Sequence, residues 1–393
     1  MKQKIDIPMS SPDISEEERQ AVNSVLQTPY LSMGKEIEAF EKEFRAYTGS
    51  RNAIAVSSGT AGLHLCIRAA KVSRDDIVIT TPFSFVASTN VILYENAVPI
   101  YVDIESKTGN MDMDLMEEIL KAYSNLGYIP DRWFPRKGWS KKKKIRAILV
   151  VDVFGQPADY DRLKNFTQNT GIKIIEDSCE SLGAEYRNKK AGTLGDFGVF
   201  GFYPNKQITT GEGGAIITND DDSASLMIAL RNQGRAAGDM WLNHKYLGYN
   251  YRLDEMSAAL GRVQVARLNE LLKKRERAAN WYNQRLSDLE GVEIPFLAPA
   301  TTRATWFVYV IRLSGELNRA QISKELGKRG IPSRPYFIPI HLQPYMVEKF
   351  GYKTGDFPIT EDIGNRSLAL PFSSIMEEHQ VEYVCSILRE IIQ

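Results

Sequence analysis

The sequence predicts an α/β protein built around a mostly parallel sheet, with a smaller α+β unit toward its C-terminal end. Through about the first 220 residues, short apolar runs rich in β-branched residues alternate with amphipathic segments, a pattern typical of strands and crossover helices. From about residue 250 the pattern changes to a long charged helical stretch followed by shorter segments. The length of 393 residues suits one large α/β domain with a smaller companion.

The expected elements of the large domain follow from the apolar runs and the residues that bound them. A first helix is expected over Ser15–Leu26, because Ser15 can cap it and the acidic residues that follow favour the positive helix end. A second helix is expected from about Gly59 to Ala70. Parallel strands are expected at Ala53–Val56, Asp76–Thr80, Val98–Val102, Ala147–Val153 and Lys173–Ile175.

The remaining elements complete the sheet and build the second domain. Strands Phe197–Phe202 and Ala215–Thr218, joined through a Gly-rich segment, are expected to extend the sheet as a hairpin. Helical spacing over Leu253–Leu289 predicts one long helix or two consecutive ones. We expect residues 1–250 to form the N-terminal segment and large domain, and residues 251–393 a linker helix and the small domain. The small domain is expected to contain a strand over Trp306–Leu313 and helices over Arg319–Arg329 and Gln380–Ile392.

The composition excludes several classes of protein. Basic and acidic residues both number 49, so the formal net charge is zero and the whole molecule does not attract nucleic acid or an anionic membrane. The three cysteines, Cys66, Cys179 and Cys385, are too few and too scattered for a disulfide framework or a metal site. The chain shows no signal peptide and no apolar run long enough to cross a bilayer. These observations predict a cytoplasmic protein with no metal and no membrane association.

Residues 124–144 stand out because basic residues are interleaved with aromatic ones. The stretch holds Arg132, Arg136, Lys137 and Lys141–Lys144 against Asp131 alone, a local net charge of +6. Such a segment can bind single-stranded nucleic acid, or the diphosphate of a small substrate. An exposed insertion between a helix and a strand is the favoured interpretation, because the rest of the chain shows no nucleic-acid-binding pattern.

Five short motifs lie at expected strand ends or helix starts, where open α/β sheets bind their ligands. Ser57-Ser58-Gly59-Thr60 starts a helix, so it can hold a phosphate or simply cap the helix. Thr80-Thr81-Pro82-Phe83-Ser84-Phe85 places aromatic residues at a strand terminus, where one can cover a flat ring. Glu176-Asp177 follows a buried strand, and a carboxylate there needs a partner, either a positive ring nitrogen or a structural ion pair.

The fourth and fifth motifs carry a lysine and an amide. Lys206 lies among small and apolar residues between Asn205 and Gly214, and a buried lysine can become a nucleophile that forms a Schiff base. A lone lysine is more often a surface residue. Gly248-Tyr249-Asn250-Tyr251-Arg252-Leu253 places an amide and a guanidinium among aromatic residues at the expected domain junction.

In order and spacing, the five motifs resemble the DegT/DnrJ/EryC1/StrS family of pyridoxal-phosphate (PLP) sugar aminotransferases. The resemblance extends from Ser32 near the start to Leu370-Pro371 near the end. It is most specific at Glu176-Asp177, followed 29 residues later by Lys206 and a Thr-Thr-Gly-Glu-Gly-Gly run. It implies PLP-dependent transferase fold type I, with a large mixed-sheet α/β domain and a smaller C-terminal α+β domain.

The resemblance also implies a role for each matched residue around the cofactor pyridoxal 5′-phosphate. Lys206 would bind the cofactor as a Schiff base and move the proton, and Asp177 would pair with the pyridinium nitrogen. Phe85 would stack on the ring and Glu180 would lie beside the ring hydroxyl, where many relatives carry Gln or His. The phosphate would be bound by three residues of the first motif and by an amide from the neighbouring subunit of a homodimer: Ser58, Gly59, Thr60 and Asn250.

Three further positions match the family near the substrate, and one position departs from the family. Tyr30, Arg334 and His341 match positions near the substrate, although a structural ion pair or a core histidine also explains the last two. Gly201 departs from the family, whose members commonly place a serine there to bind the phosphate. Lys206 itself argues against the branch of the family that replaces the lysine by histidine and carries out a dehydration.

The resemblance implies that L-glutamate gives its amino group to the cofactor and that a nucleotide-linked keto-sugar then receives it. The Asn-Lys-x-Ile-Thr-Thr-Gly-Glu-Gly-Gly spelling and Glu180 resemble enzymes that aminate C4 of a 4-keto-6-deoxy sugar. Amination at C3 or of a cyclitol, and synthesis of an aminohydroxybenzoate, remain open within the same fold. A non-catalytic regulator or nucleic-acid binder is the alternative from another class, and the presence of Lys206 and Asp177 speaks against it.

Overall fold

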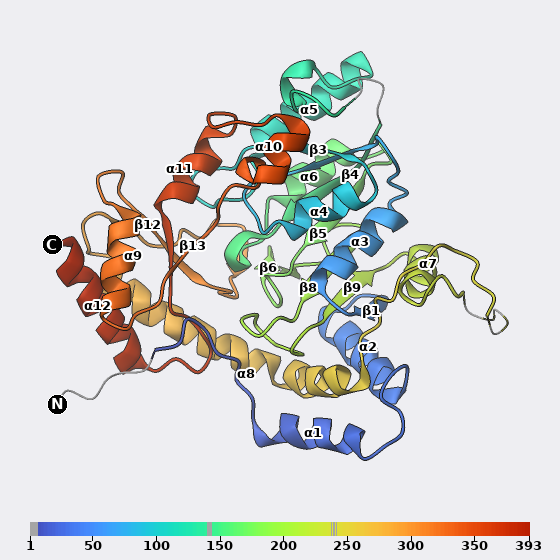
Figure 1. The fold of residues 1–393 in the computed structure, drawn as a ribbon, viewed down its shortest axis with the longest axis horizontal. Helices are drawn as coiled ribbons and strands as arrows, with labels where there is room; N and C mark the ends of the chain where they lie inside the picture. Colours follow the sequence, from blue (N-terminus) through green and yellow to red (C-terminus); the bar gives the residue numbers. More distant parts are fainter. Residues whose placement is uncertain (1–6, 140–143, 237, 239, 241) are drawn as a thin grey trace.

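A seven-stranded sheet forms the centre of the large part of the molecule (Figure 1). The computed structural model describes residues 7–139, 144–236, 238, 240 and 242–393, and in this part of the chain the strand order is β1-β9-β8-β5-β4-β2-β3. The strands are β1 (Asn52–Val56), β2 (Ile77–Thr80), β3 (Val98–Tyr101), β4 (Ile145–Val151), β5 (Lys173–Asp177), β8 (Phe197–Gly201) and β9 (Gly214–Thr218). Each of the seven strands expected here is confirmed to within about two residues.

Strand β9 gives the sheet its mixed character. It is antiparallel to both β1 and β8, whereas the other neighbouring pairs are parallel. Strand β1 therefore runs in the same direction as β8, and the carboxyl ends of six strands meet at one edge. The expected β8–β9 hairpin is present and extends the same sheet, with β9 lying between β8 and the edge strand β1. All five residues of β9 are buried, so this apolar strand is stable inside the sheet rather than at its rim.

Helices cover both faces of this sheet. On one face, α3 (Gly59–Ala69), α4 (Ala87–Tyr94) and α7 (Asp221–Arg231) pack against side chains such as Ile54 and Val56 of β1. On the other face, Ala53 and Ala55 of the same strand pack under α2 (Lys35–Thr48) and α8 (Glu255–Leu286). The alternation of side chains along β1 thus supplies both cores. Helices α5 (Met113–Leu126) and α6 (Tyr160–Thr167) cover the second face over β2, β3 and β4.

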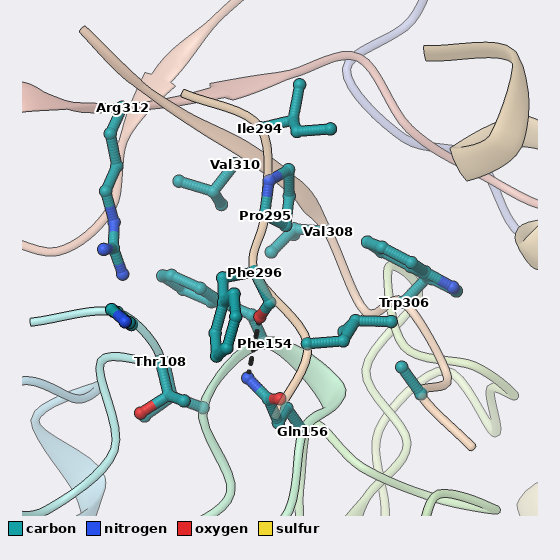
Figure 2. Close-up of a pocket in the computed structure, with 14 residues that line it drawn as sticks. Thr108, Phe154, Gln156, Ile294, Pro295, Phe296, Trp306, Val308, Val310 and Arg312 are labelled. Carbon is teal, nitrogen blue, oxygen red and sulfur yellow. Dashed lines mark hydrogen bonds between the residues drawn. The ribbon is translucent and has the colours of Figure 1, made fainter. Parts of the chain in front are cut away.

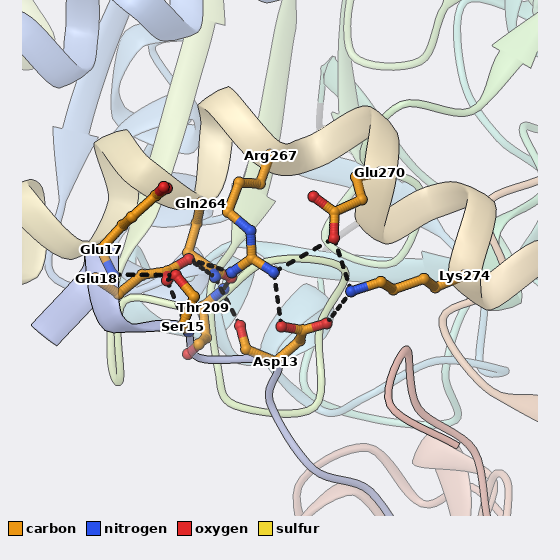
Figure 3. A network of polar contacts seen from close by, with 9 residues as sticks. All are labelled: Asp13, Ser15, Glu17, Glu18, Thr209, Gln264, Arg267, Glu270 and Lys274. Carbon is orange, nitrogen blue, oxygen red and sulfur yellow. Dashed lines mark hydrogen bonds and ion pairs between the residues drawn. The ribbon is translucent and has the colours of Figure 1, made fainter. Parts of the chain in front are cut away.

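Helix α8 connects the large part of the molecule to the C-terminal part (Figure 1). The sequence left one helix or two open over this stretch, and the structure contains a single helix of 32 residues. Helix α1 (Glu16–Leu26) lies along it, and the predicted cap is present because the Ser15 side chain accepts a hydrogen bond from Glu17 N. Figure 3 shows the polar network between the two helices, in which Arg267 pairs with Asp13 at 2.7 Å and with Glu18 at 2.6 Å.

The C-terminal part contains a second sheet of order β10-β12-β14-β13. Its strands are β10 (Val292–Glu293), β12 (Tyr309–Leu313), β14 (Ser367–Leu370) and β13 (Arg334–Pro335), and its helices are α9 (Arg319–Lys328), α10 (Pro344–Phe350), α11 (Pro358–Arg366) and α12 (Glu378–Ile392). A small sheet of β11 (Thr301–Arg303), β6 (Glu185–Tyr186) and β7 (Lys189–Lys190) joins the two parts. Ile7 packs in the core of the C-terminal sheet, although residues 1–250 were expected to belong with the large domain.

The segment 124–144 connects α5 to β4, as expected. Most of its described residues are exposed, as expected, but Phe134 is buried and its ring lies 4.1 Å from the ring of Trp139. Arg136 donates two hydrogen bonds to Asp356, at 2.5 and 2.7 Å. The predicted basic residues Lys141–Lys143 lie outside the described residues. The contacts of Arg136 fasten the insertion to the C-terminal part of the molecule.

Two findings concern membranes and metals. No helix in the described part of the chain is long and apolar enough to cross a membrane. Within the same residues, no group of three or more His, Cys, Asp or Glu side chains is arranged to hold a metal ion.

Candidate active site

The carboxyl-end edge of the large sheet brings together the residues that the motifs singled out. Asp177 is the last residue of β5 and lies in register with Val199 of the neighbouring β8, after which the chain leads to Lys206. The chain after β2 leads to Phe85, and the chain after β1 leads to Ser58. Parallel strands that end at one edge explain why motifs far apart in sequence converge here.

Lys206 lies in the connection between β8 and β9, and its side chain is 15% exposed. Its Nζ is 3.9 Å from Glu180 Oε1 and 3.8 Å from the centroid of the Phe307 ring. The ammonium group therefore lies over an aromatic face and beside an acid, in a place that solvent reaches only in part. Phe307 was not predicted as a site residue, because nothing in the spacing around it indicates a lysine partner.

Glu180 is buried beside this lysine. Its Oε2 accepts a hydrogen bond from Phe154 N at 2.9 Å. Burial raises the pKa of Glu180 to about 7, although the positive charge of Lys206 acts in the opposite direction. Close to neutral pH this carboxyl group can therefore hold a proton or release it.

Asp177 is buried and held in a fixed orientation. Its Oδ2 accepts a hydrogen bond from Ser88 Oγ at 2.6 Å, and its Oδ1 accepts one from Cys179 N at 3.3 Å. Ser88 belongs to the first turn of α4 and was missed by the sequence analysis. Its position three residues after Phe85, at the start of a helix next to a strand end, was the available signal. Two donors keep a carboxylate in a place where an unpaired charge would be costly.

The Ser58–Thr60 segment forms a cradle at the start of α3. Val56 and Gly201 both lie opposite Gly214, so this helix begins next to β8. Ser58 caps the helix by accepting a hydrogen bond from Ala61 N at 3.0 Å, and the first turn leaves backbone N–H groups without acceptors inside the helix. A Cβ atom added to Gly59 would lie 2.8 Å from Cys179 Sγ. Backbone N–H groups and small residues at a helix start suit an anion such as a phosphate.

The structure distinguishes the two phenylalanines of the second motif. Phe83 is completely buried in the core, whereas the Phe85 side chain is 64% exposed at the end of β2. An exposed aromatic face next to the Ser88–Asp177 contact is available to cover a flat ring. Phe85 is thus the residue of the pair that the geometry favours for that purpose.

Four of the predicted residues are not brought against Lys206 within one chain. Asn250 is exposed and forms an isolated β-bridge with Asn232. Tyr30 is 71% exposed and lines a surface hollow of about 650 Å³ between α1 and α2. Arg334 is exposed and donates to Ser333 O. His341 is fully buried with its Nε2 2.9 Å from Glu361 Oε1, and burial lowers the pKa of this imidazole. In this conformation His341 offers no surface to a substrate.

A small cavity lies where the chain after β4 meets the C-terminal part (Figure 2). Phe154, Gln156, Phe296, Trp306 and Arg312 are among the residues that line it, and Gln156 Nε2 donates to Phe296 O at 3.2 Å. Its volume of about 40 Å³ admits only a few water molecules. None of the predicted site residues lines it.

The residues at the sheet edge fit pyridoxal 5′-phosphate. A partly enclosed lysine, a buried and oriented carboxylate, an open aromatic face and a helix start match the amine-reactive, ring-nitrogen, ring-face and phosphate parts of that molecule. Next to the lysine, the buried Oδ1 of Asn205 has no hydrogen-bond partner among the described residues. The arrangement defines the class of PLP-dependent enzymes of fold type I.

The comparisons with known proteins identify the family within that class. Residues 12–389 match the DegT/DnrJ/EryC1/StrS aminotransferase family, and the chain belongs to it. The chain is 36% identical to GDP-perosamine synthase from Caulobacter vibrioides, over 98% of each protein. It is 29% identical to dTDP-3-amino-3,4,6-trideoxy-alpha-D-glucose transaminase from Streptomyces venezuelae, over 98% of this chain and 95% of that protein.

Solved structures agree with this assignment. The crystal structure of S. venezuelae DesV in complex with a ketimine intermediate superimposes with a TM-score of 0.86 at 28% identity, over 99% of each chain. The fold, the family and the PLP-dependent aminotransferase activity predicted from the sequence are thereby confirmed.

Proposed function

We propose that this protein transfers the amino group of L-glutamate to a nucleotide-linked keto-sugar, at C4 of a 4-keto-6-deoxy sugar. The observation that carries the proposal is the meeting of Lys206, Asp177 and Phe85 at one sheet edge, in a chain whose relatives are named for nucleotide-linked amino sugars. In the complete reaction, glutamate and the keto-sugar become 2-oxoglutarate and the amino sugar. When bound, pyridoxal phosphate supplies the electron sink that makes this exchange possible.

Lys206 is the residue that we propose to bind the cofactor and to move the proton. Its Nζ lies over the Phe307 ring, whose π face attracts the ammonium group. Glu180 lies 3.9 Å away, and its pKa of about 7 lets it hold a proton for the ring hydroxyl of the cofactor close to neutral pH.

The other site residues bind and orient the cofactor. Asp177, fixed by Ser88, pairs with the ring nitrogen and keeps it protonated, and Phe85 covers one face of the ring. Ser58, Gly59 and Thr60 hold the phosphate at the start of α3. These roles leave the opposite face of the ring for the substrates.

Amination at C4 is supported by the residues around the lysine and by the relatives. The sequence from Asn205 to Gly214, together with Glu180, resembles that of enzymes that aminate 4-keto-6-deoxy sugars at C4. The relative named for a 3-amino sugar is 29% identical, compared with 36% for GDP-perosamine synthase. The test is to incubate the protein with L-glutamate and a panel of nucleotide-linked 3-keto sugars, nucleotide-linked 4-keto sugars and keto-cyclitols, to measure 2-oxoglutarate, and to record the absorption spectrum of the bound cofactor.

The panel separates the alternatives. The proposal expects 2-oxoglutarate with a 4-keto-6-deoxy sugar and none with the Lys206→Ala variant. Turnover only with 3-keto sugars would assign the enzyme to C3. Turnover only with a keto-cyclitol would show that the substrate is a cyclitol and not a sugar. Absence of any spectral change with glutamate would remove glutamate as the amine donor.

We further propose that two copies of the chain share their sites, with Asn250 of one subunit reaching the phosphate bound by the other. Asn250 is exposed in the single chain, as such a role requires. The test mixes the inactive variants Lys206→Ala and Asn250→Ala under conditions that allow subunit exchange. Activity should return on mixing, because each mixed dimer contains one site with both residues intact. No recovery, with exchange shown independently by tagged subunits, would contradict a shared site.

A further inference from the structure

Arg275 is a buried cation without an anionic partner. It lies in α8 with 1% of its surface exposed, and no carboxylate among the described residues forms an ion pair with it. A buried charge of this kind costs several kcal/mol unless hydrogen bonds compensate for it. Its presence therefore indicates that its hydrogen bonds serve a purpose that an apolar side chain would not fulfil.

All the hydrogen bonds of Arg275 go to backbone carbonyl groups. One terminal nitrogen donates to Trp306 O at 3.2 Å and to Phe307 O at 3.1 Å. The other donates to Asn205 O at 3.1 Å and to Lys206 O at 2.6 Å. The planar guanidinium group is well suited to this arrangement, because its two terminal nitrogens point in fixed directions.

These four carbonyls belong to two chain segments that meet at the active site. The first carries Lys206, and the second carries Phe307, whose ring lies 3.8 Å from the lysine Nζ. Arg275 thus joins the backbone of the lysine to the backbone of the aromatic residue beneath its ammonium group. The second segment leads into β12 of the C-terminal part, so the contact also joins the two parts of the molecule.

A neighbouring residue secures the same loop from another side. Gln207, which is buried, donates from Nε2 to Glu180 O at 2.5 Å and to Thr305 Oγ1 at 3.2 Å. The residue after Lys206 is therefore tied to the segment that carries Glu180 and to the segment that carries Phe307. We call residues 202–213, between β8 and β9, the Lys206 loop. A shift of this loop would break the hydrogen bonds from Arg275 to the loop backbone and those from Gln207 to its two neighbouring segments.

We propose that Arg275 is a positioning residue that fixes Lys206 relative to Phe307 and thereby sets the reach of the lysine Nζ toward the cofactor. The proposal rests on the proposed role of Lys206 as the cofactor lysine. Arg275 acts through the backbone and does not touch the reacting atoms. A lysine at this place would keep the charge, but its single ammonium group cannot bridge four carbonyls on two segments.

The test compares Arg275→Lys with Arg267→Lys. Arg267 lies on the same helix, is 14% exposed and is held by Asp13 and Glu18 in the network of Figure 3. Its variant disturbs α8 but reaches the chain after Lys206 only indirectly, because Gln264 links Glu18 to Thr209 N. Three quantities are measured for both variants. They are the thermal unfolding of the cofactor-free protein, the rate at which that protein takes up pyridoxal phosphate, and the rate of the glutamate half-reaction.

Arg275→Lys is expected to slow cofactor uptake and the glutamate half-reaction by roughly 10²-fold, the loss that a misplacement of about 1 Å can cause. Arg267→Lys is expected to lower the unfolding temperature and leave both rates within about threefold of wild type. If the two variants change both rates equally, Arg275 has only a structural role and the proposal is wrong.

A second variant covers the case in which Arg275→Lys does not fold. Phe307→Leu keeps the backbone carbonyls that Arg275 binds but removes the ring beneath Nζ, so it should slow the same two rates. Unchanged rates in this variant would contradict the proposal. Borohydride reduction of the wild-type enzyme separates this outcome from failure of the proposed function. If the cofactor is found on a lysine other than Lys206, the proposed function fails before Arg275 is considered.

Discussion

Replacement of Glu180 by glutamine tests whether this carboxyl group is a neutral acid close to physiological pH. Glutamine keeps the shape of the side chain and an oxygen that can accept the hydrogen bond from Phe154 N, but it does not titrate. Burial raises the pKa of Glu180 to about 7 in the folded protein, from its ordinary value of 4.5. Because the folded pKa is the higher one, the native state binds more protons than the unfolded state between these two values.

The sign and size of the effect follow from this difference. The stability that the group contributes is fully present below about pH 4.5 and is lost as the pH rises through about 7. A difference of two to three pH units corresponds to about 3 kcal/mol in total, most of which falls between pH 5 and pH 8. Wild type should therefore lose about 2–3 kcal/mol relative to Glu180→Gln over that interval.

The assay is urea unfolding of the cofactor-free protein at several values between about pH 5 and pH 8, with wild type and variant measured side by side. Other buried acids, such as Asp152 and Glu176, are present in both proteins, so their contributions largely cancel in the difference. Repeating the pair in a Lys206→Met background should enlarge the loss, because the lysine charge favours the ionised carboxyl group. A difference in stability that stays constant with pH would refute the reasoning.

Three further outcomes are expected. Asp177→Asn should lower kcat by up to about 10²-fold, because the charged hydrogen bond to the cofactor nitrogen is worth about 1.5–3 kcal/mol; an unchanged kcat would remove that contact. Gly201→Ser adds a hydroxyl group and should tighten cofactor binding by roughly twofold to tenfold in equilibrium dialysis. The added Cβ would lie 3.5 Å from Cys179 Sγ, so it fits without crowding. Weaker binding would show that no phosphate oxygen lies nearby. Arg136→Ala should lower the free energy of unfolding in urea by at most about 1 kcal/mol. It should leave kcat unchanged, because the contact of Arg136 with Asp356 fastens the insertion outside the site. A large loss of kcat would give the insertion a role with substrate.

The strands were predictable because each is a continuous apolar run between turn residues. Parallel strands buried on both faces need such runs, and the resulting pattern is visible without the structure. The position of β9 between β1 and β8 was not predictable, because the hairpin spacing indicates which strands pair and not which outer strand joins them. The boundary between the two domains at residue 250 stays a prediction. Ile7 packs in the core of the C-terminal sheet, so a residue near the start of the chain lies with the C-terminal part of the molecule.

The predictable site residues are those that follow strand ends. Asp177 ends an apolar strand, and Lys206 and Phe85 each follow one by five residues, so their convergence follows from the topology. Arg275 was not predictable, because it lies among Lys, Arg and Glu residues of a long helix and resembles a surface charge. Its partners are four backbone carbonyls between 31 and 70 residues away, which leave no trace in the residue types.

The basic insertion illustrates a different limit of sequence reasoning. Charge and aromatic content favoured an exposed insertion and left an anionic partner open as an alternative. The Arg136 guanidinium is instead engaged by Asp356, a residue more than 200 positions away in the chain. Local composition therefore overestimated the positive charge that this part of the insertion presents to solvent.

Borohydride reduction of the purified enzyme with bound cofactor, followed by peptide mass spectrometry, tests the central claim most directly. The reduction converts the bond between cofactor and lysine into a stable amine, so the modified residue can be identified. The geometry predicts a single modified position, Lys206, and none in the Lys206→Ala variant. Modification of another lysine, or equal labelling in the variant, would contradict the assignment of Lys206 and of the site built around it.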